Sequence, residues 1–197
     1  MVQLLRNHVY SALTREYRNK QEIVQHFYHK DMNVPIWGIF EVMTLGEFGA
    51  LFTCLNYTVR CSVSKELGLH QPSDTDGFLT KKIIFALKEL RNAVAHNNVI
   101  FDTRFSRSSI DSAVASSLVN VTGIQAVSFK SIADYIVLVV YLLKCVGTPQ
   151  KDMRSLIDDF QSELENLRGK LPYPIYAKIV ATDTRRKMKD LRQFITQ

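Results

Sequence analysis

The 197 residues of the chain suffice for one domain with a hydrophobic core, and nothing in their number requires two. Hydrophobic residues make up 46% and charged residues 22%, a balance typical of a folded globular protein rather than a disordered one. The formal net charge of +6 is uneven, because residues 170–192 alone carry +5. This basic segment is a candidate polyanion contact, or equally a solvated helix face that only aids solubility. Its seven basic residues are Lys170, Lys178, Arg185, Arg186, Lys187, Lys189 and Arg192.

Cysteine spacing and hydropathy exclude further classes of protein. Cys54, Cys61 and Cys145 form no C-x-x-C pair, so we expect neither a disulfide framework nor a zinc site. The N-terminal MVQLLRNHVY lacks the uninterrupted apolar run of a signal peptide. The most apolar run, YIVLVVYLL at 135–143, is shorter than the roughly 20 residues that span a bilayer. We therefore expect a cytoplasmic protein without a membrane partner.

The first part of the chain predicts helices. Residues 3–30 indicate one or two basic helices of mixed polarity. Pro35 suits the first turn of a helix, and apolar residues then recur at helical spacing as far as residue 57, which predicts one long core helix. Gly46 and Gly49 within it mark either a tight crossing of two backbones or a kink.

The remaining elements are also helical. SVSKELGL is short and amphipathic, HQPSDTDG predicts a turn, and residues 78–96 predict the next helix. The serine-rich stretch from residue 99 to 117 loses clear periodicity, so we predict a loop or a short irregular segment there. Residues 129–146 predict a buried helix and 151–168 an amphipathic one, and LPYP separates the latter from a basic final helix. Neither strand alternation nor an internal repeat is visible, which predicts the all-α class.

The helix predicted over 78–96 carries an unusual polar face in ELRNAVAHNN, residues 89–98. With about 100° per residue, one side collects the apolar residues Leu79, Ile83, Ala86, Leu87, Leu90 and Val94. The other side collects Lys88, Glu89, Arg91, Asn92 and His96. Asn92 and His96 are neighbours four residues apart, and the long Arg91 side chain reaches the same surface.

Two features of this helix predict a partner over its polar face. Ile84 and Phe85 point the same way as the polar group and would expose large apolar surface unless something covers them. Ala93 and Ala95 are small enough to let a second helix approach closely. A second copy of the chain is the candidate partner.

Arginine, histidine and an amide together suit chemistry on a phosphodiester. Imidazole titrates near neutral pH, so it can take a proton from a nucleophilic hydroxyl or give one to a leaving oxygen. Guanidinium binds non-bridging oxygens and stabilises the charge of the transition state. Asn92 can hold His96 in a productive orientation. Because RNA cleavage requires both a base and an acid and one chain offers one histidine here, a two-fold dimer would supply both.

Two sequence segments resemble a known family. RNAVAH, residues 91–96, resembles the R-x4–6-H motif of the HEPN superfamily of all-α ribonucleases, including the polar residue after the arginine. PIWGIFEVMTLGEFGALF, residues 35–52, resembles the P-x-W…E…(T/S)-x-G segment of the Abi-like proteins, bacterial abortive-infection factors within HEPN. In the Abi-like proteins, as in this chain, this segment precedes LRN…AHN by several tens of residues. The resemblance covers roughly residues 27–105, and the apolar helix at 131–146 fits less specifically.

The resemblance implies an all-α, HEPN-like antiparallel helical bundle with additional C-terminal helices. Residues 1–197 then form a single Abi-like HEPN domain, with a basic helical segment at 1–33, a core bundle carrying the motif at 34–146, and C-terminal helices at 151–197. The implied activity is that of a metal-independent endoribonuclease, which leaves a 2′,3′-cyclic phosphate and a 5′-hydroxyl. The resemblance also implies a toxin-like role, in which RNA cleavage after phage infection halts growth; together with the two-fold dimer inferred above from the single histidine, the leading hypothesis is a homodimeric RNA endonuclease.

The resemblance assigns roles to particular residues. His96 is expected to act as general base or acid, Arg91 to bind the scissile phosphate and Asn92 to orient. RNA is the expected substrate, and a regulatory small RNA or a protein antitoxin is a candidate partner. We assign no cofactor and no metal, because the pair His26 and His29 has no third ligand nearby. The expected substrate-binding residues are Lys88, Asn97, Arg104 and Arg107, although loop arginines equally fit a plain soluble surface.

Two departures from the family pattern accompany this resemblance. Many Abi-like proteins have two histidines before the asparagine, whereas Asn97 directly follows His96 here. The region before the central segment is short, which puts RNA guidance or regulation by that region in doubt. The alternative function is a non-catalytic RNA-binding or scaffolding module, and a third interpretation makes the Arg91 face purely structural.

Overall fold

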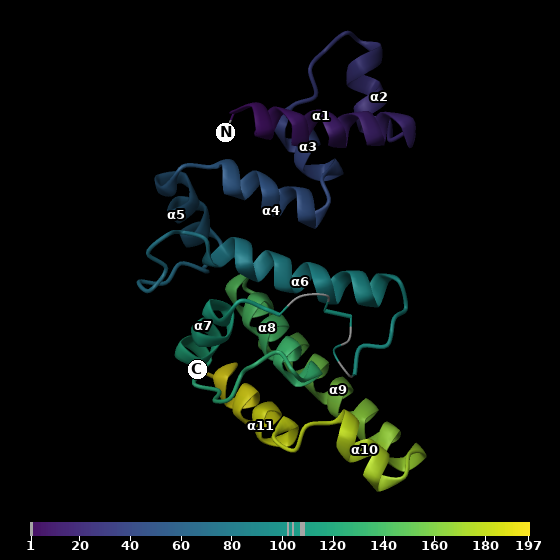
Figure 1. Ribbon diagram of the computed structural model, residues 1–197, viewed down its shortest axis with the longest axis vertical. Coiled ribbons are helices and arrows are strands. Elements are labelled where there is room, and N and C mark those ends of the chain that lie inside the picture. Colours follow the sequence, from purple (N-terminus) through teal and green to yellow (C-terminus); the bar gives the residue numbers. More distant parts are fainter. Residues whose placement is uncertain (1, 102, 104, 107–108) are drawn as a thin grey trace.

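The computed structural model describes residues 2–101, 103, 105–106 and 109–197. Within these residues the chain forms eleven α-helices and no strand, which confirms the all-α class. Figure 1 shows them stacked along the long axis of the molecule, with α1–α3 at one end, α6 across the middle and α7–α11 beyond it. The helices are α1 (Val2–Arg18), α2 (Glu22–His29), α3 (Ile36–Val42), α4 (Leu45–Cys54), α5 (Tyr57–Glu66), α6 (Leu79–Ala95), α7 (Ser112–Thr122), α8 (Ile132–Cys145), α9 (Gln150–Lys170), α10 (Tyr173–Ile179) and α11 (Thr184–Phe194). None of the helices in these described parts is both long and apolar enough to cross a membrane.

The single long helix predicted from residue 35 to 57 is wrong, because the chain breaks into α3 and α4 at Thr44. The Thr44 hydroxyl accepts a hydrogen bond from the Glu47 backbone N–H at 3.2 Å, and the Glu47 carboxylate accepts one from the Thr44 N–H at 2.8 Å. This reciprocal capping box satisfies donors that a new helix start leaves free. The T-x-x-E pattern in TLGE was readable in the sequence, but the apolar periodicity across it masked it.

Arg15 of α1 ties the N-terminal helices to this junction. Its guanidinium forms an ion pair with Glu47 and donates a hydrogen bond to the Val42 carbonyl at 3.1 Å. Burial alone would raise the pKa of the Glu47 carboxyl, but hydrogen bonds from Arg15 and Thr44 outweigh it and hold that pKa below its usual value. The polar contacts of Arg15 therefore hold the N-terminal helices together in addition to their own small hydrophobic core, formed by Leu13, Val24 and Val34.

Helix α6 is packed on two sides, against α4 on one and against α7 and α8 on the other. Phe85 of α6 lies so close to α4 that a Cβ added at Gly49 would be 2.8 Å from its Cε2 atom. Gly49 therefore marks a tight crossing rather than a kink. Ile84 is buried and Phe85 partly buried within the single chain, so the expectation that these two side chains need a partner to cover them is wrong.

The segment predicted as a loop from residue 99 to 117 in fact includes the start of α7. The Asp111 carboxylate caps the helix by accepting a hydrogen bond from the Ala113 N–H at 2.9 Å. Val114 and Leu118, four residues apart, are fully buried in the main core. Serine lowers the helical signal of the sequence, but burial of this face outweighs the weak propensity.

The C-terminal part contains the two helices predicted around 129–146 and 151–168, as α8 and α9. The predicted basic final helix is divided into α10 and α11. Lys187 is buried, with its Nζ 2.6 Å from Asp134 and 2.9 Å from Asp183, so its inclusion in an exposed basic surface is wrong. Its ammonium also donates a hydrogen bond to the Ala126 carbonyl at 2.9 Å. A buried cation needs such partners, and the apolar residues around it on α11 turn that face inward.

The α4–α6 crossing yields a stability prediction with a matched control in the same helix. Gly49→Ala places a methyl group against the Phe85 ring, whereas Gly46→Ala meets Lys88 Cδ at 3.4 Å and Thr44 Oγ1 at 3.9 Å, both ordinary contacts. Both variants replace glycine by alanine in the same helix, so their gains in helix propensity are similar and largely cancel when the two are compared. We expect the free energy of unfolding, measured by urea denaturation, to be lower for Gly49→Ala than for Gly46→Ala by roughly 1–3 kcal/mol. Equal stability of the two variants would contradict the tight crossing.

Candidate active site

The predicted site residues lie at the C-terminal end of α6. The helix begins where Asp74 accepts a hydrogen bond from the Leu79 N–H at 3.1 Å, and it ends at Ala95. Its apolar side is buried as predicted as far as Leu90, which is 8% exposed, except that Leu87 is only half-buried. Val94, predicted on the same inward stripe, is instead 60% exposed. The last turn of α6 therefore projects past the edge of the core and presents its side chains to solvent.

A specific backbone motif ends the helix at His96 and Asn97. The Asn97 N–H binds the Val94 carbonyl at 3.1 Å, and the Asn98 N–H binds the Ala93 carbonyl at 2.9 Å. Asn97 has a φ of +51°, in the left-handed region. This is a Schellman termination, in which asparagine is the usual substitute for glycine. Asn97 thus has a structural role that by itself explains an asparagine after His96.

A hollow of about 300 Å³ lies beside this last turn. Three of the predicted site residues, Lys88, Asn92 and His96, line it together. The structure therefore brings these three side chains to one place, as the helical spacing predicted. The hollow is completed by Glu89, Ala93, Asn98 and Phe105, none of which we had assigned to the site.

The sequence indicated one of these additional lining residues but not another. Glu89 lies three residues before Asn92 and seven before His96, so helical spacing already placed it on the same face. Phe105 follows the helix in an irregular segment and reaches the hollow because its ring packs 5.0 Å from that of Tyr135 in α8. No local pattern in the sequence indicates that contact.

Arg91 lies beside the hollow rather than in its lining. Its exposed guanidinium donates a hydrogen bond from Nη1 to the Asn92 side-chain oxygen at 3.1 Å. Asn92 therefore orients Arg91 within one chain, in addition to lining the same hollow as His96. A guanidinium has five N–H donors, so this contact leaves capacity for a phosphate.

Lys88 is less available than its charge suggests. Its ammonium lies 3.3 Å from the Glu89 carboxylate and 5.0 Å from the centroid of the Phe85 ring. The remaining predicted substrate-binding residues, Arg104 and Arg107, lie outside the described residues. In the described part of the chain, no group of three or more His, Cys, Asp or Glu residues is arranged to hold a metal ion.

Comparison with known protein families gives a match over the part of the chain that carries this site. The family model described as Abi-like protein matches residues 3–102. The chain belongs to the Abi-like protein family. The matched segment covers about half of the chain, including α1–α6 and the Arg91–His96 motif, and it starts well before residue 27, where the motif-based resemblance began. No curated protein and no solved structure matches the chain significantly.

The termination motif predicts how Asn97 responds to substitution. Asn97→Val forces a β-branched side chain into the left-handed region and should lower the free energy of unfolding by about 1–2 kcal/mol. Asn97→Gly removes the amide but suits the backbone, so its stability should equal or exceed that of the wild type. Asn98→Val is the control and should stay within about 0.5 kcal/mol. Thermal denaturation measures all three, and equal effects of valine at 97 and 98 would contradict the motif.

Proposed function

We propose that this Abi-like protein is a metal-independent endoribonuclease of abortive infection, acting in the cytoplasm as a homodimer. The observation that carries the proposal is the gathering of Arg91, Asn92 and His96 at the exposed end of α6, inside the segment that the family model matches. These three side chains supply a phosphate ligand, an orienting amide and a proton-transfer group. A small RNA or a protein antitoxin is the proposed means of restraining the activity.

The proposed reaction is an in-line displacement within the RNA chain. One His96 removes the proton from a 2′-hydroxyl, whose oxygen forms a bond to the adjacent phosphorus. The bond from phosphorus to the 5′-oxygen breaks, and a second imidazole protonates that leaving oxygen. The products are a 2′,3′-cyclic phosphate and a 5′-hydroxyl, and the Arg91 guanidinium neutralises the charge on the non-bridging oxygens.

The second imidazole in this reaction comes from a second copy of the chain. Val94 and Val99 lie two residues before and three residues after His96 and are 60% and 66% exposed, so the end of α6 that carries the proposed catalytic histidine also presents apolar side chains to solvent. Burial of these side chains across a two-fold axis removes them from water and brings the two α6 ends together. This surface replaces Ile84 and Phe85 as the argument for a dimer.

The alternative is a non-catalytic RNA-binding or scaffolding module. The favouring observation is that Arg91 lies outside the hollow that His96 lines, while the Lys88 ammonium is paired with Glu89. In that case RNA binding weakens steeply as salt concentration rises, and the purified protein never cuts RNA.

Substitution of the histidine separates these two functions. His96→Ala should reduce RNA cleavage by on the order of 10²–10⁴-fold, because general acid–base catalysis is lost. His96 is exposed, so the variant should fold and elute as the wild type does. His29→Ala, at an exposed histidine of α2, is the control and should cut normally. EDTA should leave cleavage intact, and wild-type protein that binds RNA without cutting it would favour the scaffold.

The proposed dimer surface has its own test. Val94→Glu places a charge on the exposed apolar surface at the end of α6 and should convert the dimer into a folded monomer with little cleavage activity. Val146→Glu, at a valine 69% exposed at the end of α8, is the matched control and should remain dimeric and active. Sedimentation velocity measures the oligomeric state. Cleavage by a monomeric wild-type protein, or an active Val94→Glu monomer, would rule out a shared site.

A further inference from the structure

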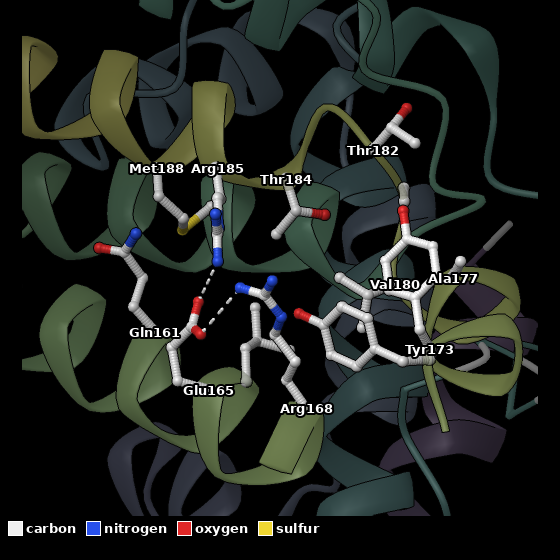
Figure 2. Close-up of a pocket in the computed structure, with 13 residues that line it drawn as sticks. Gln161, Glu165, Arg168, Tyr173, Ala177, Val180, Thr182, Thr184, Arg185 and Met188 are labelled. Atoms are coloured by element: carbon white, nitrogen blue, oxygen red, sulfur yellow. Dashed lines mark hydrogen bonds and ion pairs between the residues drawn. The ribbon is translucent and has the colours of Figure 1, made fainter. Parts of the chain in front are cut away.

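A second hollow lies between α9, α10 and α11, in the half of the chain beyond the family match (Figure 2). Its volume is about 250 Å³, and it shares no lining residue with the hollow beside His96. The proposed cleavage reaction does not use it. The side chains that line it combine positive charge, aromatic rings and a buried hydroxyl, a combination typical of a ligand site.

The buried hydroxyl belongs to Thr184, the first residue of α11. Thr184 is 2% exposed, and its Oγ1 atom has no hydrogen-bond partner among the residues that the structure describes. Figure 2 shows this oxygen directed toward the side of the hollow formed by α10. A buried polar atom without a partner destabilises a protein, so an atom of a ligand that hydrogen-bonds to it would remove that penalty.

The beginning of α11 adds a preference for anions at the same place. Asp183 precedes the helix but makes no side-chain capping bond. The first N–H groups of a helix carry partial positive charge and lack partners within the helix. Of these, the Thr184 N–H donates to the Ala181 carbonyl at 3.1 Å, and the Asp183 carboxylate pairs with Lys187 at 2.9 Å. The N–H groups of Arg185 and Arg186 are therefore the ones that favour a negatively charged group next to Thr184.

Two arginines in the lining extend this positive region. Arg185 and Arg168 both contact Glu165, at 2.5 Å and 3.5 Å, as the dashed lines in Figure 2 show. The hydrogen bond from Arg185 holds the pKa of the Glu165 carboxyl below its usual value, so that carboxyl stays ionised at neutral pH. Two guanidinium groups against one carboxylate leave a net charge of +1. Because each guanidinium has five donors, both can also bind an anion.

The α10 side of the hollow is aromatic. Tyr173 is 71% exposed and Tyr176 is partly buried, and both line the space. Leu164, Val180 and Met188 supply a buried apolar floor. An exposed aromatic ring beside an apolar floor offers a stacking surface for a planar group, and nucleobases stack on such rings irrespective of their identity.

We propose that this hollow binds a nucleoside monophosphate unit, with the phosphate at Arg168, Arg185 and the start of α11 and the base against Tyr173 and Tyr176. The unit is either a free nucleotide or the 5′-phosphorylated end of an RNA strand, since both present the same chemistry. The volume suits one nucleotide rather than several, because it lies just below the roughly 300–1,000 Å³ of drug-sized ligand sites. This proposal stands independently of the cleavage activity.

Binding of AMP to the full-length chain, measured by isothermal titration calorimetry, tests the proposal. Arg168→Gln should weaken binding roughly ten- to hundred-fold, because it removes a charged donor to the phosphate. The matched control is Arg154→Gln, at an exposed arginine of the same helix about 21 Å away along its axis. The control should bind AMP as the wild type does. Absence of saturable AMP binding, or equal binding by Arg168→Gln and the wild type, would overturn the proposal.

Thr184→Val provides a second variant whose effects on stability and binding are expected to be opposite. It keeps the shape of the side chain but removes the unpartnered hydroxyl, so the melting temperature without ligand should be unchanged or higher. AMP binding should nevertheless weaken by roughly threefold to tenfold. Unchanged affinity in this variant would remove Thr184 from the site and contradict the proposed position of the phosphate.

The source of the nucleotide is distinguished in the His96→Ala background, where RNA stays intact if the proposed reaction is correct. Short RNA strands with a 5′-phosphate or a 5′-hydroxyl are compared with AMP and with inorganic phosphate. If the strand with a 5′-phosphate binds and displaces AMP while the strand with a 5′-hydroxyl does not bind, the hollow is assigned to RNA ends. Tight binding of AMP without such a preference assigns it to a free nucleotide. If inorganic phosphate binds as tightly as AMP, the base has no role and the proposal is wrong.

Discussion

The molecule depends on the contact between Phe85 of α6 and the bare backbone of α4 at Gly49. This contact closes the side of α6 that the main core leaves open, and it joins the N-terminal helices to the rest of the molecule. A helix covered on two sides can expose functional side chains only where the cover ends. In α6 that place is the last turn, between the buried Leu90 and the exposed Val94. The position of Arg91, Asn92 and His96 therefore follows from where packing stops.

On the side of α6 that packs against α7 and α8, a buried polar cluster holds the C-terminal helices together. Lys187 of α11 pairs with Asp134 of α8, and Asp134 also accepts hydrogen bonds from the backbone N–H groups of Ser128 and Phe129. A buried ion pair is a poor source of net stability, but each partner becomes costly if the other is lost. The cluster therefore fixes how α11 lies on α8 more than it strengthens the fold. Because α8 also carries Tyr135, on which Phe105 packs, this arrangement extends to the hollow beside His96.

The two halves of the chain have different relations to the Abi-like family. The matched segment contains the helix with the Arg91–His96 motif and the α4 helix that covers it. The helices beyond it supply most of the main hydrophobic core, so α6 is supported by residues outside the matched segment. They also contain the hollow with Thr184 and its two arginines. In our proposals the first half carries the chemistry, and the second half supports it and adds a binding site.

The sequence by itself determined the helical class, the amphipathic character of α6 and the grouping of Asn92 and His96. All three follow from residue spacing along one chain segment, since helical periodicity is a local property. Only the tertiary structure decided that α4 covers Phe85, that Lys187 is buried and that Phe105 lines the hollow. It also decided that α3 and α4 are separate, although the capping box at Thr44 was a local signal. The cover over Phe85, the burial of Lys187 and the position of Phe105 depend on contacts between residues distant in sequence. Packing and charge in three dimensions set these contacts, rather than any local pattern.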